Sequence, residues 1–506
     1  MIRNIYITLM VVFSFGLVSF VLAAANTNTQ GDQSSSEGNN PFFTVSKLPF
    51  QAPPFNKIKD SDYKPAIEEG MKQQLAEIQK IADNPAKPTF ENTLVALEKS
   101  GQLLDRVSMV FNAVTSANTD SLLQSVQEEE APKLAAHNDA IFLNTKLFER
   151  VKAIYEKRAE LKLNHESLKL VSYYYDKFVR EGANLSNEDK TKLKKLNEEE
   201  ATLIAKFDNK LLAGTKAGAL IVSDTSKLDG LSQAEIDAAA QSAASRGLTG
   251  KWLIPLQNTT QQPDLQILTN RETRKELFEK SWNRNELNDA NDTRSDIERI
   301  AKIRAEQAHL LGFPNYAAWR LENQMAKTPQ AVEKFLAGLV PATVANEQKE
   351  AADIQAFINK SGDNIKLEPW DWNYYANKLR KSRFNFDESE VRPYFVLENV
   401  LQKGLFYEAH ELYGLTFKEL HNIPVYQKDV RVFEVFDKDG SPLALFYADY
   451  FKRDNKSGGA WMDNLMQQSK LLGTKPVVYN VTNFTKPAPG QPALLSYDDV
   501  TTMFHE

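Results

Sequence analysis

The stretch that decides the fold is Leu495-Ser-Tyr-Asp-Asp-Val-Thr-Thr-Met-Phe-His505-Glu506. Ser496 and Asp499 have the spacing of a capping box, in which a serine caps the first helical turn and an acidic residue three positions later binds back to it. Leu495 and Val500 occupy the two hydrophobic positions that flank such a cap. None of the glycine, proline or basic residues that end helices follows them. The stretch therefore predicts a helix that begins at Ser496 and still continues at Glu506.

His505 and Glu506 have the form of the first two residues of a His-Glu-x-x-His motif. On a zinc-peptidase helix this motif places two imidazoles one turn apart on one face, with the glutamate beside them as general base. The second histidine would fall three residues beyond Glu506. We therefore expect the parent gene to continue in frame, to encode that histidine, and to supply a glutamate ligand on a following helix.

The other five histidines are expected to have packing or surface roles. Two of them also precede a glutamate, but a different residue stands where the motif needs its second histidine: Lys169 after His165-Glu166, and Gly414 after His410-Glu411. No Gly-x-Ser-x-Gly sequence is present, which disfavours serine-hydrolase chemistry. The chain has no cysteine, which excludes cysteine nucleophiles and cysteine metal ligands.

Composition indicates a folded protein with a large buried core. The 506 residues are 42% hydrophobic and 10% aromatic, which is enough for several layers of packed structure. The net charge is −6, and acidic and basic residues are interspersed along the chain. Because binding to phosphate backbones needs a clustered cationic surface, nucleic acid is not an expected partner.

The amino-terminal segment predicts export. Arg3 is followed by an apolar run from residue 5 to residue 22, and Ala23 and Ala25 then fit the small-residue rule for cleavage. We interpret residues 1–25 as a signal peptide and residues 26–40, rich in Asn, Ser, Thr, Gln and Gly, as a disordered leader. The expected location is periplasmic or secreted, with no stable membrane association after cleavage. An uncleaved anchor is the alternative, since the apolar run is just long enough to span a bilayer.

The rest of the chain is predicted to be mostly helical and two-lobed. Helical patterns cover residues 63–247 and resume from Arg271 to Leu412, with prolines such as Pro341 as expected breaks. Residues 251–257 are interpreted as an extended crossing between the two lobes. The expected domains are an N-terminal helical domain, 41–255, and the first part of a catalytic domain, 256–506.

A small antiparallel β-sheet is predicted before the final helix. Residues 430–436 and 443–451 are rich in β-forming residues, and the Asp437–Gly440 link between them favours a hairpin. Residues 476–484 form a third run. A sheet followed by a His-Glu helix is the order expected of a zincin-type peptidase, where an edge strand can bind an extended substrate. The alternative is an ordinary hairpin that braces a helical protein.

Several further segments resemble the thimet oligopeptidase/neurolysin family of zinc peptidases. The resemblance covers about residues 40 to 506 and is closest to the bacterial peptidyl-dipeptidase (dipeptidyl carboxypeptidase) branch of that family. The segments that carry it are Arg304 with Leu310–Phe313 and Tyr316-Ala317, Gln324–Lys327, Trp252–Pro263, Pro369–Tyr375, Val391-Arg-Pro-Tyr-Phe395, Asp449–Met462 and Asp498–Glu506.

This resemblance implies a mostly helical, two-lobed body with a deep, narrow channel, monomeric when complete. It implies one Zn²⁺ ion per complete enzyme, bound in part by His505, and Glu506 as the base that activates a zinc-bound water. The substrates would be short unstructured peptides, cleaved to release C-terminal dipeptides. An oligopeptidase-type endopeptidase of the same family is the alternative.

A reading of a different class is that the 506-residue chain acts as a non-catalytic, helical peptide-binding fragment. A catalytic zinc ion needs about three protein ligands, and this sequence offers one at the expected place. We therefore expect the chain as given to bind no stoichiometric zinc and to lack peptidase activity.

Overall fold

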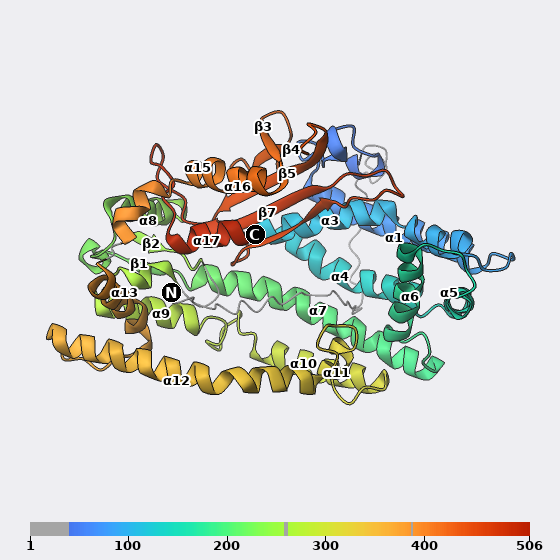
Figure 1. Ribbon diagram of the computed structural model, residues 1–506, viewed down its shortest axis with the longest axis horizontal. Helices are drawn as coiled ribbons and strands as arrows, with labels where there is room; N and C mark the ends of the chain where they lie inside the picture. Colours follow the sequence, from blue (N-terminus) through green and yellow to red (C-terminus); the bar gives the residue numbers. More distant parts are fainter. Residues whose placement is uncertain (1–39, 258–261, 386–387) are drawn as a thin grey trace, which may run out of the picture.

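The computed structural model describes residues 40–257, 262–385 and 388–506. The predicted signal peptide, 1–25, and all of the predicted leader except Asn40 lie outside the described residues. Within these ranges the protein is mostly helical, with one two-stranded and one five-stranded sheet, as the predicted fold class requires (Figure 1). No helix in the described ranges combines the length and the apolar character that crossing a membrane requires.

The N-terminal part is a set of capped helices. Asp120, Asn144, Asn164 and Ser186 each accept a hydrogen bond from the first turn of the helix that follows, which satisfies an amide that the helix cannot pair. The helices are α1 (Asp60–Ala82), α2 (Ala96–Glu98), α3 (Gln102–Ala117), α4 (Ser121–Phe142), α5 (Thr145–Glu156), α6 (His165–Arg180) and α7 (Asn187–Ala217).

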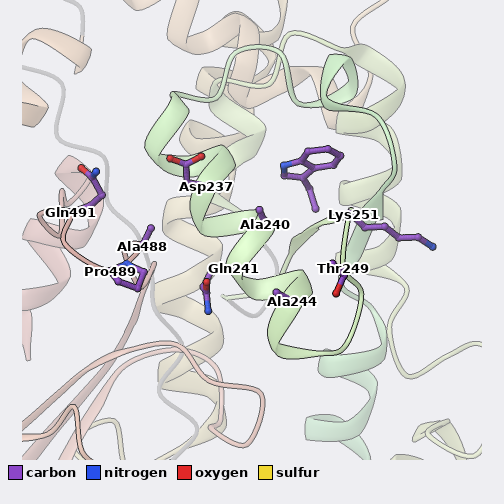
Figure 2. A pocket seen from close by; sticks show the side chains of 11 residues that line it. Asp237, Ala240, Gln241, Ala244, Thr249, Lys251, Ala488, Pro489 and Gln491 are labelled. Atoms are coloured by element: carbon purple, nitrogen blue, oxygen red, sulfur yellow. The ribbon is translucent and has the colours of Figure 1, made fainter.

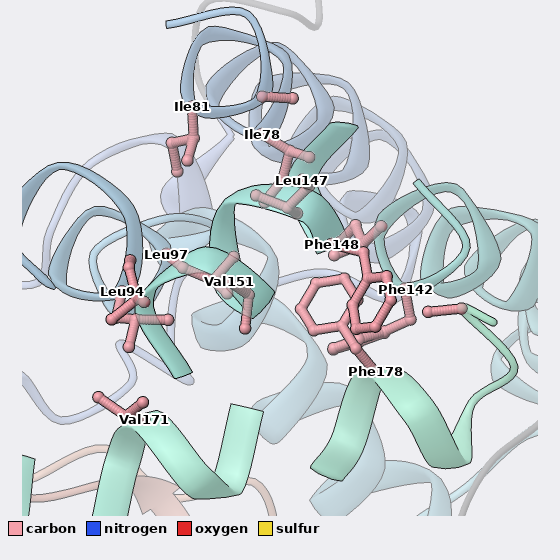
Figure 3. Packing of buried hydrophobic residues seen from close by; sticks show 14 residues of the cluster. Ile78, Ile81, Leu94, Leu97, Phe142, Leu147, Phe148, Val151, Val171 and Phe178 are labelled. Carbon is pink, nitrogen blue, oxygen red and sulfur yellow. The ribbon is translucent and has the colours of Figure 1, made fainter. Parts of the chain in front are cut away.

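One buried cluster joins α1, α4, α5 and α6 (Figure 3). The rings of Phe142 and Phe178 lie 5.0 Å apart between centroids, and Phe148 stacks on Phe178 at 5.9 Å. Such aromatic contacts add specific geometry to the hydrophobic burial. The N-terminal helices therefore have a core of their own.

The predicted crossing at residues 251–257 contains a short strand. β2 (Trp252–Ile254) pairs antiparallel with β1 (Leu220–Val222), and α8 (Gln233–Ser245) lies between them in the sequence. A hydrophobic cluster here includes Leu220 and Ile254 together with Leu265 and Leu277. Packing is thus continuous across the predicted boundary at residue 255, and the division into two domains stays a prediction.

Helices continue to residue 413, as predicted: α9 (Arg271–Trp282), α10 (Arg294–Leu310), α11 (Tyr316–Leu321), α12 (Pro329–Ser361), α13 (Trp372–Phe384), α14 (Glu388–Val391), α15 (Leu397–Asn399) and α16 (Phe406–Tyr413). The expected break at Pro341 is wrong, because α12 runs through it. Ala337, whose carbonyl loses its helical partner at this proline, is exposed, so water can replace the lost hydrogen bond.

The C-terminal sheet has the strand order β3-β4-β5-β7-β6. The predicted hairpin is confirmed as β4 (Arg431–Phe436) and β5 (Pro442–Phe451), and the third run is confirmed as β7 (Val477–Phe484). At the turn, the amide of Gly440 donates to the Asp437 carbonyl over 2.8 Å, and Gly440 has the positive φ of 80° that favours glycine. The edges are two strands that were not predicted, β3 (Thr416–Leu420) and β6 (Trp461–Met466).

The sheet is mixed, which corrects the expectation of a purely antiparallel one. Three of its pairings are antiparallel, but β5 and β7 pair in parallel. A parallel pair needs a crossover of a dozen or more residues, and residues 452–476 provide it. β7 is consequently an inner strand, buried along nearly its whole length.

A buried polar junction joins this sheet to α3. Asp449 and Lys456 are both 0% exposed, and Arg453 donates to both Asp449 carboxylate oxygens over 2.7 Å. Lys456 donates to Asp449 Oδ1 over 3.0 Å, and Arg453 also donates to the backbone carbonyl of Ala117, the last residue of α3. Although burial alone would raise the pKa of Asp449, the two cations hold it below its usual range. This cluster is called the Asp449 junction below.

Candidate metal centre

The helix predicted from the closing stretch is present as α17 (Tyr497–His505). The amide of Asp499 donates to Ser496 Oγ over 3.0 Å, and the amide of Ser496 donates to the Asp499 carboxylate over 2.9 Å. This confirms the capping box. The Glu506 amide donates to the Thr502 carbonyl over 3.0 Å, so helical hydrogen bonding extends through Glu506, as predicted.

One face of α17 packs against the sheet and the π-helical segment Val400–Leu405 (η8). Met503 and Leu495 are each 2% exposed and belong to a cluster with residues of β5, β7 and η8. Phe504 lies so close to Gly404 that a Cβ there would come within 2.9 Å of its ring. Figure 1 shows the C-terminal end of α17 near the middle of the molecule's long axis. The packing fixes how the helix presents its last two residues.

Those two residues differ in exposure. His505 is exposed, and Glu506 is half-buried. Burial raises the pKa of the Glu506 carboxyl, and the neighbouring His505 opposes that rise. Within the described part of the chain no hydrogen bond joins either side chain to another residue. A carboxyl whose pKa is raised binds a proton more readily than an ordinary glutamate, as a general base must.

The described residues fit a zinc site in the type of their donors but do not complete it. One imidazole and one carboxylate lie at the end of α17, whereas a catalytic zinc ion takes about three protein ligands. No group of three potential ligands gathers around His505 in the ranges that the structure describes. The assignment of His505 as ligand and Glu506 as base stays a prediction.

One cluster of three carboxylates elsewhere has the spacing of a metal site but already contains a cation. Lys133 Nζ lies 2.6 Å from Glu68, 3.2 Å from Glu129 and 2.8 Å from Glu130. The ammonium group occupies the place that an ion would take. The cluster is therefore an ion-pair network between α1 and α4.

The other histidines have structural roles where the structure shows their contacts. Burial lowers the pKa of His137 to about 4, and its Nε2 lies 2.6 Å from Gln74 Oε1. Ring nitrogens of His309 and His410 lie 3.0 and 3.2 Å from backbone carbonyls, those of Pro314 and Leu415. Neither His165 nor His410 belongs to a group of three potential ligands among the described residues. These placements agree with the packing and surface roles expected for them.

The backbone pairing that precedes α17 was not predicted from the sequence. Residues 395–397 pair with residues 493–495, immediately before the cap: the amide of Leu397 donates to the Ala493 carbonyl and that of Leu495 to the Phe395 carbonyl, each over 2.9 Å. The one available signal was the segment Val391–Phe395, which carried the family resemblance without an assigned role.

A cavity of about 520 Å³, widely open to solvent, lies between α8 and the loop that leads to α17. Figure 2 shows Ala240, Gln241 and Ala244 of α8 on one side and Ala488, Pro489 and Gln491 of the loop on the other. Its lining is a mixture of small, polar and charged side chains together with the aromatic side chain of Trp252. Neither His505 nor Glu506 lines it, so it is separate from the candidate metal centre.

Known proteins similar to this chain are peptidases. Residues 265–506 match the model of peptidase family M3. The chain is 51% identical over 467 residues to dipeptidyl carboxypeptidase of Escherichia coli K12, covering 92% of this chain and 69% of that protein. It is 50% identical to dipeptidyl carboxypeptidase of Salmonella typhimurium, with the same coverage of both chains. Oligopeptidase A of Escherichia coli K12 is 30% identical over 474 residues, again 92% of this chain and 69% of that protein. The chain therefore belongs to peptidase family M3, a family of metallopeptidases.

Proposed function

We propose that the protein is a zinc peptidase that releases dipeptides from the C-terminus of short, unstructured peptides. The observation that carries this proposal is the capped helix α17, which presents His505 and Glu506 beside the sheet in a chain 51% identical to a dipeptidyl carboxypeptidase. Imidazole nitrogen is a preferred zinc ligand, and a half-buried carboxyl with a raised pKa is a competent base.

The two residues have different roles in this proposal. His505 holds the metal as one of its ligands. Glu506 takes a proton from the attacking water and can return it to the leaving amine. A zinc ion at this place supplies Lewis acidity, which polarises the peptide carbonyl and makes water easier to deprotonate. The edge strand β6, whose Met462 is 46% exposed, offers unpaired backbone groups to an extended peptide.

Replacing Glu506 by Gln separates chemistry from metal binding. The amide keeps the size of the side chain but cannot accept the proton, so turnover by the full-length protein should fall at least about 10²-fold while zinc content stays the same. His505→Ala should instead lose the metal, which elemental analysis measures. The matched controls are Glu411→Gln and His410→Ala, in the His-Glu pair of α16, which should change neither quantity. Normal turnover by Glu506→Gln would disprove its role as base.

Substrate specificity is tested with one peptide in two forms. A peptide with a free C-terminus should release dipeptides step by step, and amidation of that terminus should slow the reaction sharply. The second candidate function, internal cleavage, is supported by the 30% identity to an oligopeptidase. Equal cleavage of both forms at internal bonds would favour it.

Export to the periplasm or the medium belongs to the same proposal. It is supported by the signal-peptide pattern of residues 1–25. Sequencing of the mature amino terminus should give a start at or near Asn26. A membrane-bound species that begins at Met1 would support the anchor instead.

A further inference from the structure

Arg392 lies in the segment that supports α17. This segment, residues 392–397, ends in the backbone pairing with residues 493–495, directly before the cap at Ser496. A change in the position of residues 395–397 would therefore move the start of α17. Any contact that fixes the position of residues 392–397 therefore also fixes the position of α17.

Arg392 connects this segment to α8, 157 residues away in the sequence. Its Nη1 donates to Glu235 Oε1 over 2.6 Å, and the two side chains are 29% and 14% exposed. The other oxygen, Glu235 Oε2, accepts from the amide of Ser232 over 2.7 Å and so closes the capping box of α8. Glu235 is thus itself held in place, and a partly buried, charge-assisted hydrogen bond is of the stronger kind.

Two further carboxyls make Arg392 electrostatically important. Burial raises the pKa of Asp264 to about 7, and burial also raises the pKa of Asp499, the capping-box partner of Ser496 in α17. The positive charge of Arg392 opposes the rise at both carboxyls. Without it, Glu235, Asp264 and Asp499 would lose a cation that they share.

Direct packing between α8 and the loop before α17 is interrupted. The cavity of about 520 Å³ separates Ala240 and Ala244 from Pro489 (Figure 2). Along this cavity, solvent-accessible space lies between α8 and the loop. The ion pair between Arg392 and Glu235 links α8 to the segment 392–397, which pairs with the end of that loop.

We propose that Arg392 is a positioning residue, which holds the start of α17 against α8 and thereby orients His505 and Glu506. The roles of those two residues rest on the proposed function, whereas the connection from α8 to α17 does not. Small displacements of catalytic groups have large effects on rate, since a shift of 1 Å can lower it about 10²-fold.

Hydrogen–deuterium exchange of the full-length protein tests the connection without reference to catalysis. In Arg392→Gln, amides of residues 497–506 should exchange about tenfold faster, the effect of losing one charge-assisted hydrogen bond, while those of α3 stay unchanged. Arg392→Lys should restore most of the protection. The matched control is Arg299→Gln, which breaks an Arg–Glu pair between α10 and α7 and should leave α17 unchanged. The double variant with Glu235→Gln should be no worse than Arg392→Gln alone.

Steady-state kinetics then test the consequence for catalysis. In Arg392→Gln, kcat should fall about tenfold with little change in KM, because Glu506 is displaced rather than the substrate site. Unchanged exchange in α17, or equal acceleration throughout the protein, would overturn the proposal. Faster exchange in α17 with a normal kcat would confirm the connection and count against Glu506 as the base, so the two ideas can fail separately.

Discussion

Two aspartates with similar partners lie in very different surroundings. Asp449 binds Arg453 and Lys456 at the junction of the sheet with α3, where its side chain is 0% exposed. Asp353 on α12 binds Lys349 and Arg383, each over 2.9 Å, where its side chain is 28% exposed. Cations hold the pKa of both carboxyls below its usual range. The cost in stability of removing the carboxylate therefore depends on whether water can solvate the cations that remain. At Asp353 water replaces the lost partner, and at Asp449 water has no access.

Large apolar side chains on α12 are also exposed to solvent. Phe335 is 67% exposed and Val340 is 54% exposed, while Asp449 lies beside a cluster that contains the fully buried Leu445 and Tyr447. The rules of local helix formation hold in both regions, since Thr328 caps α12 as Ser496 caps α17. Tertiary packing, rather than local sequence, separates them.

The largest expected effect is that of Asp449→Asn. The amide keeps the shape but leaves the buried Arg453 without its counter-charge, and Lys456, whose pKa burial lowers to about 7, loses the carboxylate that holds its proton. The free energy of unfolding should therefore fall by about 3–5 kcal/mol. Urea unfolding measures this. A loss below about 1 kcal/mol would show that burial does not distinguish the two aspartates.

Asp208 is a carboxyl without a cationic partner among the described residues. Burial raises its pKa to about 7, and no cation there opposes the rise. A folded pKa above the unfolded value of about 3.9 means that its favourable contribution is complete below pH 4 and is lost as the pH rises through 7. Asp208→Asn should therefore stabilise the protein at pH 8, by at most about 4 kcal/mol, and leave it unchanged at pH 4. Asp449 has the opposite sign: its contribution is present above pH 4 and is lost on acidification. The test is the free energy of unfolding of the parent protein and of Asp208→Asn at pH 4 and at pH 8. An equal effect of the substitution at both pH values would contradict the raised pKa of Asp208.

Ser496→Ala removes the hydroxyl that accepts the Asp499 amide in the capping box of α17. Loss of the cap should cost about 1 kcal/mol and accelerate amide exchange in α17. Ser186→Ala, which removes the equivalent cap from α7, should have a similar global cost without an effect on α17. Equal exchange in α17 for the two variants would show that the cap does not hold this helix.

Local signals predicted the parts of the fold that local interactions form. The pair Ser496 and Asp499 predicted the start of α17, and Asp437–Gly440 predicted the hairpin, because each cap or turn is specified within a few residues. The parallel pairing of β5 with β7 depends on a contact across the connecting segment 452–476, for which the sequence carries no short-range signal.

The candidate site shows the same limit. His505 and Glu506 are adjacent in the sequence and could be identified from a motif, whereas Arg392 and Glu235 meet only in the folded protein. The Asp449 junction likewise joins segments more than 300 residues apart, through the Arg453 contact with Ala117. Motifs identify residues that carry chemistry, but the residues that orient them depend on tertiary structure.

The smallest expected effect is that of Asp353→Asn, the counterpart of Asp449→Asn. The substitution again replaces a carboxylate that binds one lysine and one arginine, so the chemical change is the same. Lys349 and Arg383 are 70% and 48% exposed and can be hydrated at once, and the pair gains little from its geometry because salt and solvent screen it. The urea midpoint should therefore match that of the parent protein within error, and 1 M salt should not separate the two. A loss comparable to that of Asp449→Asn would mean that α12 is held to α13 by charge, and that exposure is a poor guide to the importance of an ion pair in this protein.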